Sequence, residues 1–124
     1  MRKGANGIMK ILIVDDHPGM RAILAELLRE MGEYEPIEAP NGEAALRLVP
    51  HHQPEVAVVD MRLPGMDGIQ TAARLREISP DLRVIICTAD PSLAIGRETG
   101  DLTICDKSEM PGSLLEALQT VGQT

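Results

Sequence analysis

The length and composition of this chain limit what it can be. Its 124 residues are enough for one hydrophobic core, and 44% hydrophobic with 25% charged residues is typical of a globular domain. The net charge of −7 and the single aromatic residue argue against direct nucleic acid binding, because phosphates would be repelled and bases would find almost no stacking partner. No apolar run approaches the roughly 20 residues of a membrane span, and Met1–Lys10 lacks the apolar core of a signal peptide. We therefore expect a cytoplasmic protein without membrane contact.

The cysteines and histidines do not form an obvious motif. Cys87 and Cys105 lie inside apolar runs, which is typical of small buried side chains and not of a secreted disulfide framework. His17, His51 and His52 have no cysteine or carboxylate spacing that would make them a zinc site, so we interpret them as surface residues.

Short apolar runs alternate with segments of helical spacing along the chain. Runs of successive apolar, β-branched residues predict strands that are covered on both faces, and a proline in the second run predicts an edge strand. The five predicted strands are Lys10–Asp15, Tyr34–Ala39, Val56–Asp60, Val84–Thr88 and Leu102–Asp106. This alternation predicts the α/β class, with a single doubly wound parallel sheet.

The segments between the strands carry helix signals. Pro18–Met31 opens with a proline and repeats apolar residues at helical spacing. The residues that share its apolar face are Met20, Ile23, Leu24, Leu27, Leu28 and Met31. Further helices are predicted at Gly42–Val49, Gly68–Ile78 and Pro111–Val121. One proline and two glycines interrupt Asp90–Gly100, so the fourth helix is predicted to be short or irregular. Residues 1–8 lack periodicity and are expected to be a flexible leader before a domain over residues 9–124.

Polar and charged residues end the predicted strands at one edge of the sheet. Ligands of open parallel sheets bind beyond the carboxyl ends of the strands. The residues at these ends are Asp15, Asp16, Asp60, Thr88 and Lys107. Three close carboxylates need a cation, and an oxygen-only site suits Mg²⁺ better than zinc. A carboxylate beside such a metal can attack phosphorus while the metal and a lysine neutralise the phosphoryl oxygens.

Each of these residues alone also has an ordinary structural interpretation. Asp16 or His17, before a proline, can cap the first helix, and Asp60 can precede a turn. Thr88 and Lys107 can be a capping hydroxyl and a solvated charge. The functional interpretation depends on their gathering at the same edge.

Three segments resemble those of response-regulator receiver domains, particularly the branch joined to helix-turn-helix outputs: MKILIVDDHPGMRAILAELL, VAVVDMRLPGMDGIQTAARLR and VIICTA. The resemblance runs from Met9 to the end of the chain. It implies a flavodoxin-like sheet with strand order 2-1-3-4-5 and a phosphoacceptor switch in a two-component phosphorelay. The implied partner is a histidine kinase or phosphotransfer protein, and the resemblance also allows a homodimer. The implied role is signalling, with self-phosphorylation and slow autodephosphorylation as the only chemistry.

The resemblance also implies a role for each residue at the strand ends. Asp60 would be the phosphoacceptor, Thr88 the switch hydroxyl and Lys107 the lysine that pairs with the phosphate. Mg²⁺ is the implied cofactor, and its implied ligands are Asp15, Asp16, Asp60 and the backbone carbonyl of Arg62. Asp15 would act largely through water.

The chain departs from the family pattern in its second half. The aromatic residue usual three positions before the lysine is Ile104 here, and Ser108 stands where proline is frequent. Lys107 follows Thr88 by 19 positions, a few fewer than usual. These departures concern the relay from phosphorylation to output. Two alternatives stay open: a receiver-fold interaction module that signals without phosphate, and a phosphatase of the haloacid-dehalogenase kind, whose motif has two aspartates separated by one residue instead of adjacent.

Overall fold

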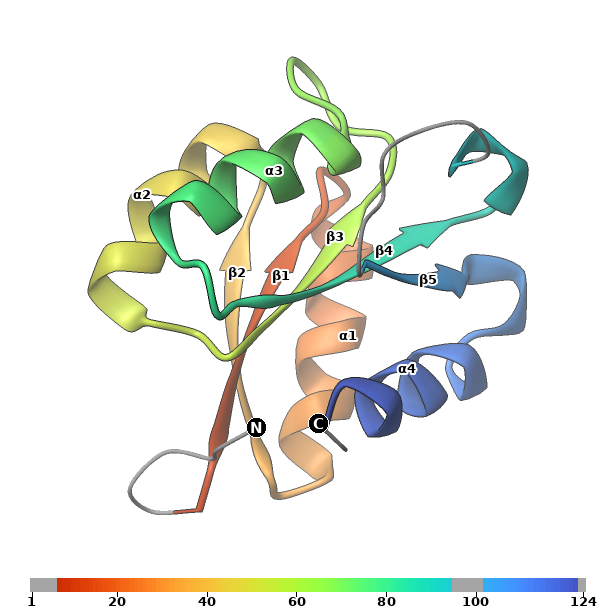
Figure 1. Ribbon diagram of the computed structural model, residues 1–124. Coiled ribbons are helices and arrows are strands. Elements are labelled where there is room, and N and C mark those ends of the chain that lie inside the picture. The colour runs from red at the N-terminus through yellow and green to blue at the C-terminus, as the bar shows by residue number, and fades with distance from the viewer. Residues whose placement is uncertain (1–6, 95–101, 123–124) are drawn as a thin grey trace.

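Five parallel strands form one sheet in a computed structural model that describes residues 7–94 and 102–122 (Figure 1). The strands are β1 Met9–Val14, β2 Tyr34–Ala39, β3 Val56–Asp60, β4 Arg83–Thr88 and β5 Thr103–Asp106. Their order is β2-β1-β3-β4-β5, and every pair is parallel. The predicted fold class and strand order are therefore confirmed.

Helices follow the strands as the sequence predicts, except that the second helix is longer than expected. The described helices are α1 Pro18–Glu30, α2 Gly42–His52, α3 Gly68–Ile78 and α4 Gly112–Gly122, with the short 3₁₀ helices η1 Pro91–Ala94 and η2 Lys107–Glu109. Helix α2 continues beyond the predicted end at Val49 and contains Pro50. Between β4 and β5 the described residues hold η1, which agrees with a short element there. The remainder of Asp90–Gly100 and most of the predicted leader lie outside the described residues.

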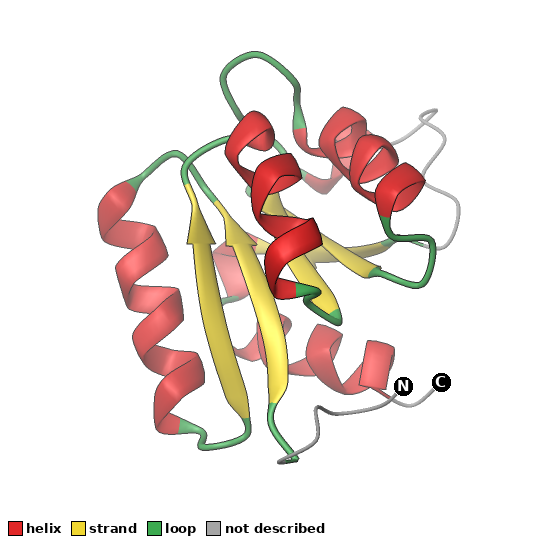
Figure 2. Ribbon diagram, turned by 90° about the vertical axis from the view of Figure 1, so that its left-hand side faces the viewer, coloured by secondary structure: helices red, strands yellow, loops and turns green. Residues whose placement is uncertain are grey.

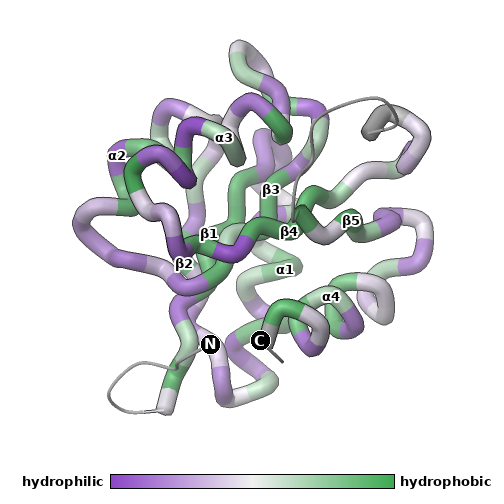
Figure 3. The backbone as a smooth tube through the Cα atoms, in the orientation of Figure 1, coloured by the Kyte–Doolittle hydropathy of each residue, from purple (hydrophilic) through white to green (hydrophobic). Residues whose placement is uncertain are grey.

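The helices cover both faces of the sheet (Figure 2). Successive side chains of a strand point to opposite faces, so each buried strand serves two cores. Leu12 and Val14 of β1 pack with α2 and α3, whereas Ile11 and Ile13 pack with α1 and α4. In Figure 3 the central strands are coloured mainly as hydrophobic, whereas the helices mix hydrophobic and hydrophilic residues. None of the described helices is long and apolar enough to cross a membrane.

The two edge strands are covered less completely than the central ones. β2 contains Pro36 and alternates exposed and buried residues, as predicted for an edge. β5 lies at the opposite edge, and Cys105 is its only fully buried residue. Ile104 belongs to the face covered by α2 and α3 but is only partly buried there.

Helix α1 buries only part of its predicted apolar face. Leu24 and Leu28 are buried, but the side of the helix that carries Ile23 faces solvent, and Ile23 is 64% exposed. Met20 and Met31 are also exposed, at 36% and 37%. The helical spacing therefore identifies the helix correctly but overstates how much of its apolar face reaches the core.

Candidate functional site

The carboxyl ends of the central strands bring the acidic residues together. The sheet register pairs Val14 of β1 with Val59 of β3, so Asp15 and Asp60, which follow these residues, lie at the same edge. Both side chains are buried, with 2% and 8% of each residue exposed. Lys107 follows β5, which is separated from β3 by β4, and begins η2. The predicted gathering of strand-end residues is thus present for these three.

Lys107 lies between the two buried carboxylates. Its Nζ is 3.0 Å from Asp60 Oδ2 and 3.6 Å from Asp15 Oδ2. Burial raises the pKa of Asp60 above its ordinary value, and the charge of Asp15 adds to this effect, whereas the hydrogen bond and charge of Lys107 oppose it. Burial would lower the pKa of Lys107, but the hydrogen bond and charge of Asp60 together with the charge of Asp15 outweigh burial and raise it. The ammonium group therefore compensates part of the negative charge of these two carboxylates.

Asp15 and Asp16 differ in their surroundings. Asp15 Oδ1 accepts the backbone N–H of His17 at 2.9 Å, and Asp15 O accepts a 2.8 Å hydrogen bond from Arg21 Nη1. Asp16 has a side chain that is 41% exposed, and the ring of His17 is 80% exposed. One ligand atom from each of Asp15, Asp16 and His17 can lie within 4.8 Å of the others. His17 is on the surface as predicted, yet it stands beside the two carboxylates, which the sequence interpretation did not foresee.

The donor set at this edge suits a hard divalent cation. The carboxylate oxygens of Asp15, Asp16 and Asp60 are the kind of ligand that Mg²⁺ prefers, and the exposure of Asp16 leaves room for the waters that Mg²⁺ keeps. The backbone N–H of Arg62 donates to Asp60 Oδ1 at 3.4 Å, which places the residue with the predicted carbonyl ligand next to the site. The residues present therefore fit the implied cofactor.

Thr88 is buried at the end of β4, but its hydroxyl is engaged locally. Thr88 Oγ1 accepts the N–H of Asp90 at 3.1 Å and donates to the carbonyl oxygen of Asp90 at 3.2 Å. These two bonds close the turn that leads into η1. The single hydrogen of the hydroxyl is therefore engaged with the Asp90 carbonyl, and this bond must break before the hydroxyl can donate to another oxygen.

Gly68 supports the end of β3, which carries Asp60, in a way that the sequence interpretation missed. A Cβ added at Gly68 would lie 2.5 Å from the backbone oxygen of Asp60 and 2.8 Å from Met61 Cα. The N–H of Gly68 donates to Met61 O at 2.8 Å, and Asp67 caps the same helix end with a capping box. The beginning of α3 can therefore approach the end of β3 only with glycine at this position. The Asp67-Gly68 pair before a helical pattern was the available signal.

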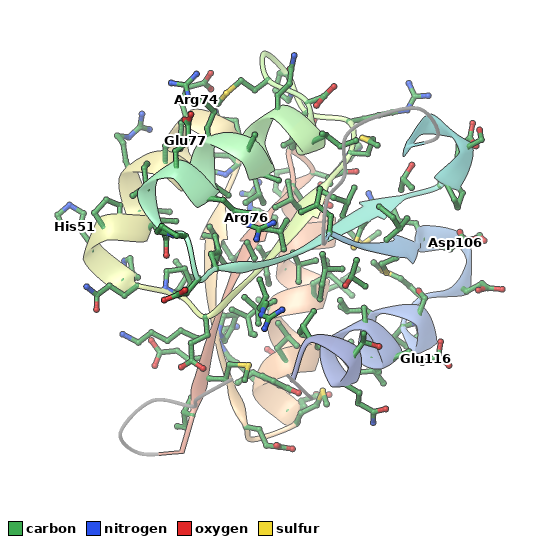
Figure 4. The ribbon with its side chains drawn as sticks, viewed as in Figure 1. His51, Arg74, Arg76, Glu77, Asp106 and Glu116 are labelled. Atoms are coloured by element: carbon green, nitrogen blue, oxygen red, sulfur yellow. The ribbon has the colours of Figure 1, made fainter. Side chains whose placement is uncertain are left out.

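Arg21 and Ser108 also contribute contacts that the sequence interpretation did not assign. Arg21 reaches from α1 to the carbonyl of Asp15, and its Nε is 3.5 Å from Glu38 Oε1. The N–H and hydroxyl of Ser108 donate to Asp106 Oδ1 at 2.9 Å and 2.7 Å. Asp106 lies at the end of β5 (Figure 4). Serine in place of the frequent proline thus anchors the turn that carries Lys107.

Comparison with known proteins agrees with this architecture. A family model described as "Response regulator receiver domain" matches residues 11–119. The chain is 42% identical over 93 residues to the Sporulation initiation phosphotransferase F of Bacillus subtilis (strain 168), which covers 75% of this chain and 74% of that protein. It is 38% identical over 117 residues to the Transcriptional activator protein ExaE of Pseudomonas putida, which covers 91% of this chain and 55% of that protein. The chain therefore spans about half the length of the second relative.

Solved structures show the same likeness. The response regulator protein TrrA of Thermotoga maritima, solved in complex with Mg(2+)-BeF, superposes with a TM-score of 0.80 at 31% identity. The match covers 92% of this chain and 99% of that chain. Sheet order, family model and relatives agree, and the chain belongs to the response regulator receiver domain family of two-component signalling.

Proposed function

We propose that this chain is a phosphoacceptor switch in which Asp60 takes a phosphoryl group from a histidine kinase or phosphotransfer protein. The observation that supports this most directly is the buried Asp60 carboxylate at the end of a central strand, 3.0 Å from the ammonium of Lys107 and beside the acidic residue Asp15. A buried carboxylate with a cation in contact is suited to attack an electrophilic phosphorus and to hold the product.

The transfer needs a metal ion, and the chain offers the residues to hold one. Asp15, Asp16, Asp60 and the backbone carbonyl of Arg62 would hold Mg²⁺, which when bound supplies positive charge to the phosphoryl oxygens. A carboxylate oxygen of Asp60 forms the new O–P bond while the bond from phosphorus to the donor's histidine nitrogen breaks, and the electron pair of that bond stays on the nitrogen. The departing imidazole then takes up a proton.

Lys107 and Thr88 would respond to the new group. Lys107 now pairs with the Asp60 carboxylate, and after phosphorylation it would pair with a phosphoryl oxygen at nearly the same position. The positive charge of Lys107 thus stays compensated. Thr88 gives up its hydrogen bonds with Asp90 and donates its hydroxyl to another phosphoryl oxygen. The turn between β4 and η1 therefore loosens when Asp60 is phosphorylated, and this change is the signal.

The relatives support a role in signalling. One is a phosphotransferase of sporulation and another a transcriptional activator by their printed names, and TrrA was solved with Mg(2+)-BeF. A receiver with a net charge of −7 is expected to act in the cytoplasm through protein partners and not through direct contact with nucleic acid.

A second candidate function is a receiver-fold interaction module that signals without phosphate. The engagement of the Thr88 hydroxyl with Asp90, together with Ile104 at the usual aromatic position, favours this candidate. Both features concern the response to phosphorylation and neither removes a residue that the transfer itself requires. We therefore place it second.

Phosphorylation by a small donor separates the two candidates. The purified chain is incubated with acetyl phosphate and MgCl₂, and the intact mass is measured before and after treatment with hydroxylamine, which cleaves acyl phosphates. We expect one phosphoryl group, removed by hydroxylamine, in the natural chain and in Asp81→Asn, a control aspartate that is exposed just before β4 at the far end of the sheet. Asp60→Asn should remain unmodified. A stable modification, or one that persists in Asp60→Asn, rejects the proposal.

A further inference from the structure

The two cysteines of the chain meet on adjacent strands beside the site. Cys87 of β4 and Cys105 of β5 are partners in the sheet register, and both belong to the core on the α1 and α4 face. Both are free and buried, with 2% and 1% of each residue exposed. They are the only cysteines in the sequence, so any thiol chemistry of the chain takes place here.

The surroundings of the two thiols make them unequal. A hydrogen bond from Cys87 lowers the pKa of Cys105 to about 7, whereas this bond and burial raise the pKa of Cys87. Cys105 Sγ also lies 3.3 Å from Ser113 Oγ, whose single hydrogen is engaged with the carbonyl oxygen of Asp106 at 2.7 Å. The two sulfurs therefore lie on the same face of adjacent paired strands, which is the arrangement in which oxidation of one sulfur can be followed by its capture by the other.

We propose that Cys87 and Cys105 are a thiol oxidation site that closes to a reversible disulfide with hydrogen peroxide and thereby alters the sheet edge that carries Thr88 and Lys107. The Cys105 thiolate attacks one peroxide oxygen, the O–O bond breaks, and the leaving hydroxide takes a proton to become water. The Cys87 sulfur then attacks the resulting sulfenic acid, the S–O bond breaks, and a second water leaves with the Cys87 proton. Two thiols are oxidised by two electrons and one peroxide is reduced to two waters.

The strand arrangement allows this bond and gives it a consequence. Neighbouring strands lie about 4.8 Å apart, which is within the usual Cα separation of disulfides, but the two Cβ atoms of a bonded pair stand closer, at about 3.8 Å. Closing the bond therefore draws the two strands together locally. Among the described strands β5 lies at the edge and pairs with β4 alone, so β5 is the strand that moves. A strained disulfide of this kind is also readily reduced, which makes the modification reversible.

The two cysteines are connected directly to site residues. Thr88 follows Cys87, and Lys107 lies two residues after Cys105, so a local shift of β5 against β4 changes the position of the ammonium relative to Asp60. The carbonyl of Cys87 also accepts the N–H of Met61, the residue after Asp60, at 2.8 Å. This inference concerns the sheet edge itself and does not rest on phosphorylation. Access of peroxide to the buried pair requires transient opening of the edge strand, so oxidation should be slower than that of an exposed thiol.

Mass spectrometry and NMR on the intact chain test the proposal. The reduced protein is treated with hydrogen peroxide, quenched with catalase, and alkylated under denaturing conditions before the mass is measured. We expect a monomer that is lighter by two hydrogen atoms and has lost both free thiols, and that regains them with dithiothreitol. Amide signals of Thr88 and Lys107 should shift on oxidation and return on reduction, while those of Gly32 and Asp81, at the far end of the sheet, stay in place.

Single variants serve as controls for the assignment. Cys87→Ala and Cys105→Ala each leave one thiol, so neither forms the intramolecular bond or shows the reversible shift at Lys107. The proposal is overturned if the oxidised natural chain keeps its thiols, gains oxygen without losing hydrogen, or links two chains. It is equally overturned if the bond forms while Thr88 and Lys107 keep their amide signals.

Discussion

Lys107 competes with a metal ion for the same carboxylates. Its ammonium lies 3.0 Å from Asp60 and 3.6 Å from Asp15, so a cation that binds these side chains must work against a positive charge already in contact with them. We therefore predict that Lys107→Ala strengthens Mg²⁺ binding on the order of tenfold, the scale of one nearby unit charge in a partly buried site. Titration with MgCl₂, followed by the amide signals of Asp15 and Asp16, measures the change.

The matched control is Lys10→Ala. Lys10 Nζ donates to His52 O at 3.3 Å, away from the strand ends that form the site, so its removal should leave Mg²⁺ affinity unchanged. Asp16→Ala in the Lys107→Ala background should reverse the gain, because it removes a proposed ligand. Equal affinity in Lys107→Ala and the natural chain contradicts the competition.

Asp60 in its ionised form destabilises the metal-free fold. Its pKa is raised in the folded state, mainly by burial, so folding favours the protonated carboxyl over the carboxylate. This penalty is absent below about pH 3.9, where Asp60 is protonated in both states, and it grows as pH rises through the raised pKa. Asp60→Asn removes the charge at constant size and leaves Asp15 near Lys107.

We predict that Asp60→Asn raises the free energy of unfolding by about 1 kcal/mol at pH 7 in EDTA, a common size for a single-site effect. The gain should shrink as pH falls toward 4, since the natural chain then carries the same neutral group. Urea unfolding at several pH values measures both trends. A variant that is less stable at pH 7 would show that the ion pair with Lys107 outweighs the burial of the carboxylate.

Residues that act through long side chains or local turns are the part of the site that the sequence does not reveal. The strand-end aspartates and Lys107 can be predicted, because all strands of a parallel sheet end at one edge. The contact of Arg21 with the Asp15 carbonyl depends on a rotamer of a flexible side chain, and the bond between Thr88 and Asp90 depends on the turn after β4. Neither has a periodic pattern that sequence analysis could detect.

Helix α3 and strand β3 meet at a point where only glycine fits. Gly68→Ala places a methyl group against the backbone of Asp60 and Met61, and backbone cannot move aside as a flexible side chain can. We predict that this variant loses about 1–3 kcal/mol of stability, as in other overpacked positions. The fraction labelled by acetyl phosphate at a fixed time should fall as well, because the shift displaces the Asp60 carboxylate.

The control for this substitution is Gly19→Ala. Gly19 also lies in the first turn of a helix, but a Cβ there meets no atom within 4 Å. Its stability should be unchanged or slightly higher, since alanine in a helix restricts the unfolded chain. Similar losses in both variants, measured by urea unfolding, would indicate a general effect of alanine in a first helical turn and not a collision with Asp60.

The elements themselves can be predicted from the sequence to different degrees. β1, β3 and β4 are covered on both faces, which makes them continuously apolar, and their bounds match the prediction within one residue. The apolar face of α1 predicts the helix but not the 64% exposure of Ile23, because periodicity carries no information about how wide a stripe the sheet covers. The meeting of Cys87 and Cys105 depends on the register between β4 and β5, which hydrophobic patterning alone does not specify when both runs are apolar.

At the scale of the whole molecule, the two faces of β5 connect the site to different neighbours. Cys105 faces α1 and α4, and its sulfur contacts Ser113 in the first turn of α4. Ile104 faces the other side, where it is only partly buried. An aliphatic side chain with no hydroxyl and a stiff χ1 gains little from moving inward, so the residue that is usually aromatic contributes little to a switch here.

The response to phosphorylation should therefore appear at the β4 end and not at α4. A ligand shifts a conformational equilibrium only by its differential interaction with the two states. In the described part of the chain, the phosphoryl group competes with Asp90 for the hydroxyl of Thr88, which forms two hydrogen bonds with Asp90. We predict that beryllofluoride with Mg²⁺, standing in for the phosphoryl group, speeds hydrogen exchange of the Asp90 amide, because that N–H loses its acceptor. Exchange across Pro111–Val121 should change less. The prediction extends to the rest of Asp90–Gly100, whose later residues lie outside the described part of the chain.

Hydrogen exchange followed residue by residue decides where the signal goes, and two variants assign its cause. Asp60→Asn should show no response to beryllofluoride anywhere, because a neutral amide replaces the carboxylate that would bind beryllium. Thr88→Ala should still bind beryllofluoride, but the exchange rate of the Asp90 amide should not change on binding. In this variant the Asp90 N–H has no hydroxyl acceptor to lose in either state. A large protection change across Pro111–Val121 with Asp90 unaffected in the natural chain would place the coupling in α4 instead. Ile104 would then transmit the signal without an aromatic ring. It would do so across β5, because Ile104 lies on one face of this strand and Cys105 packs with α4 on the other.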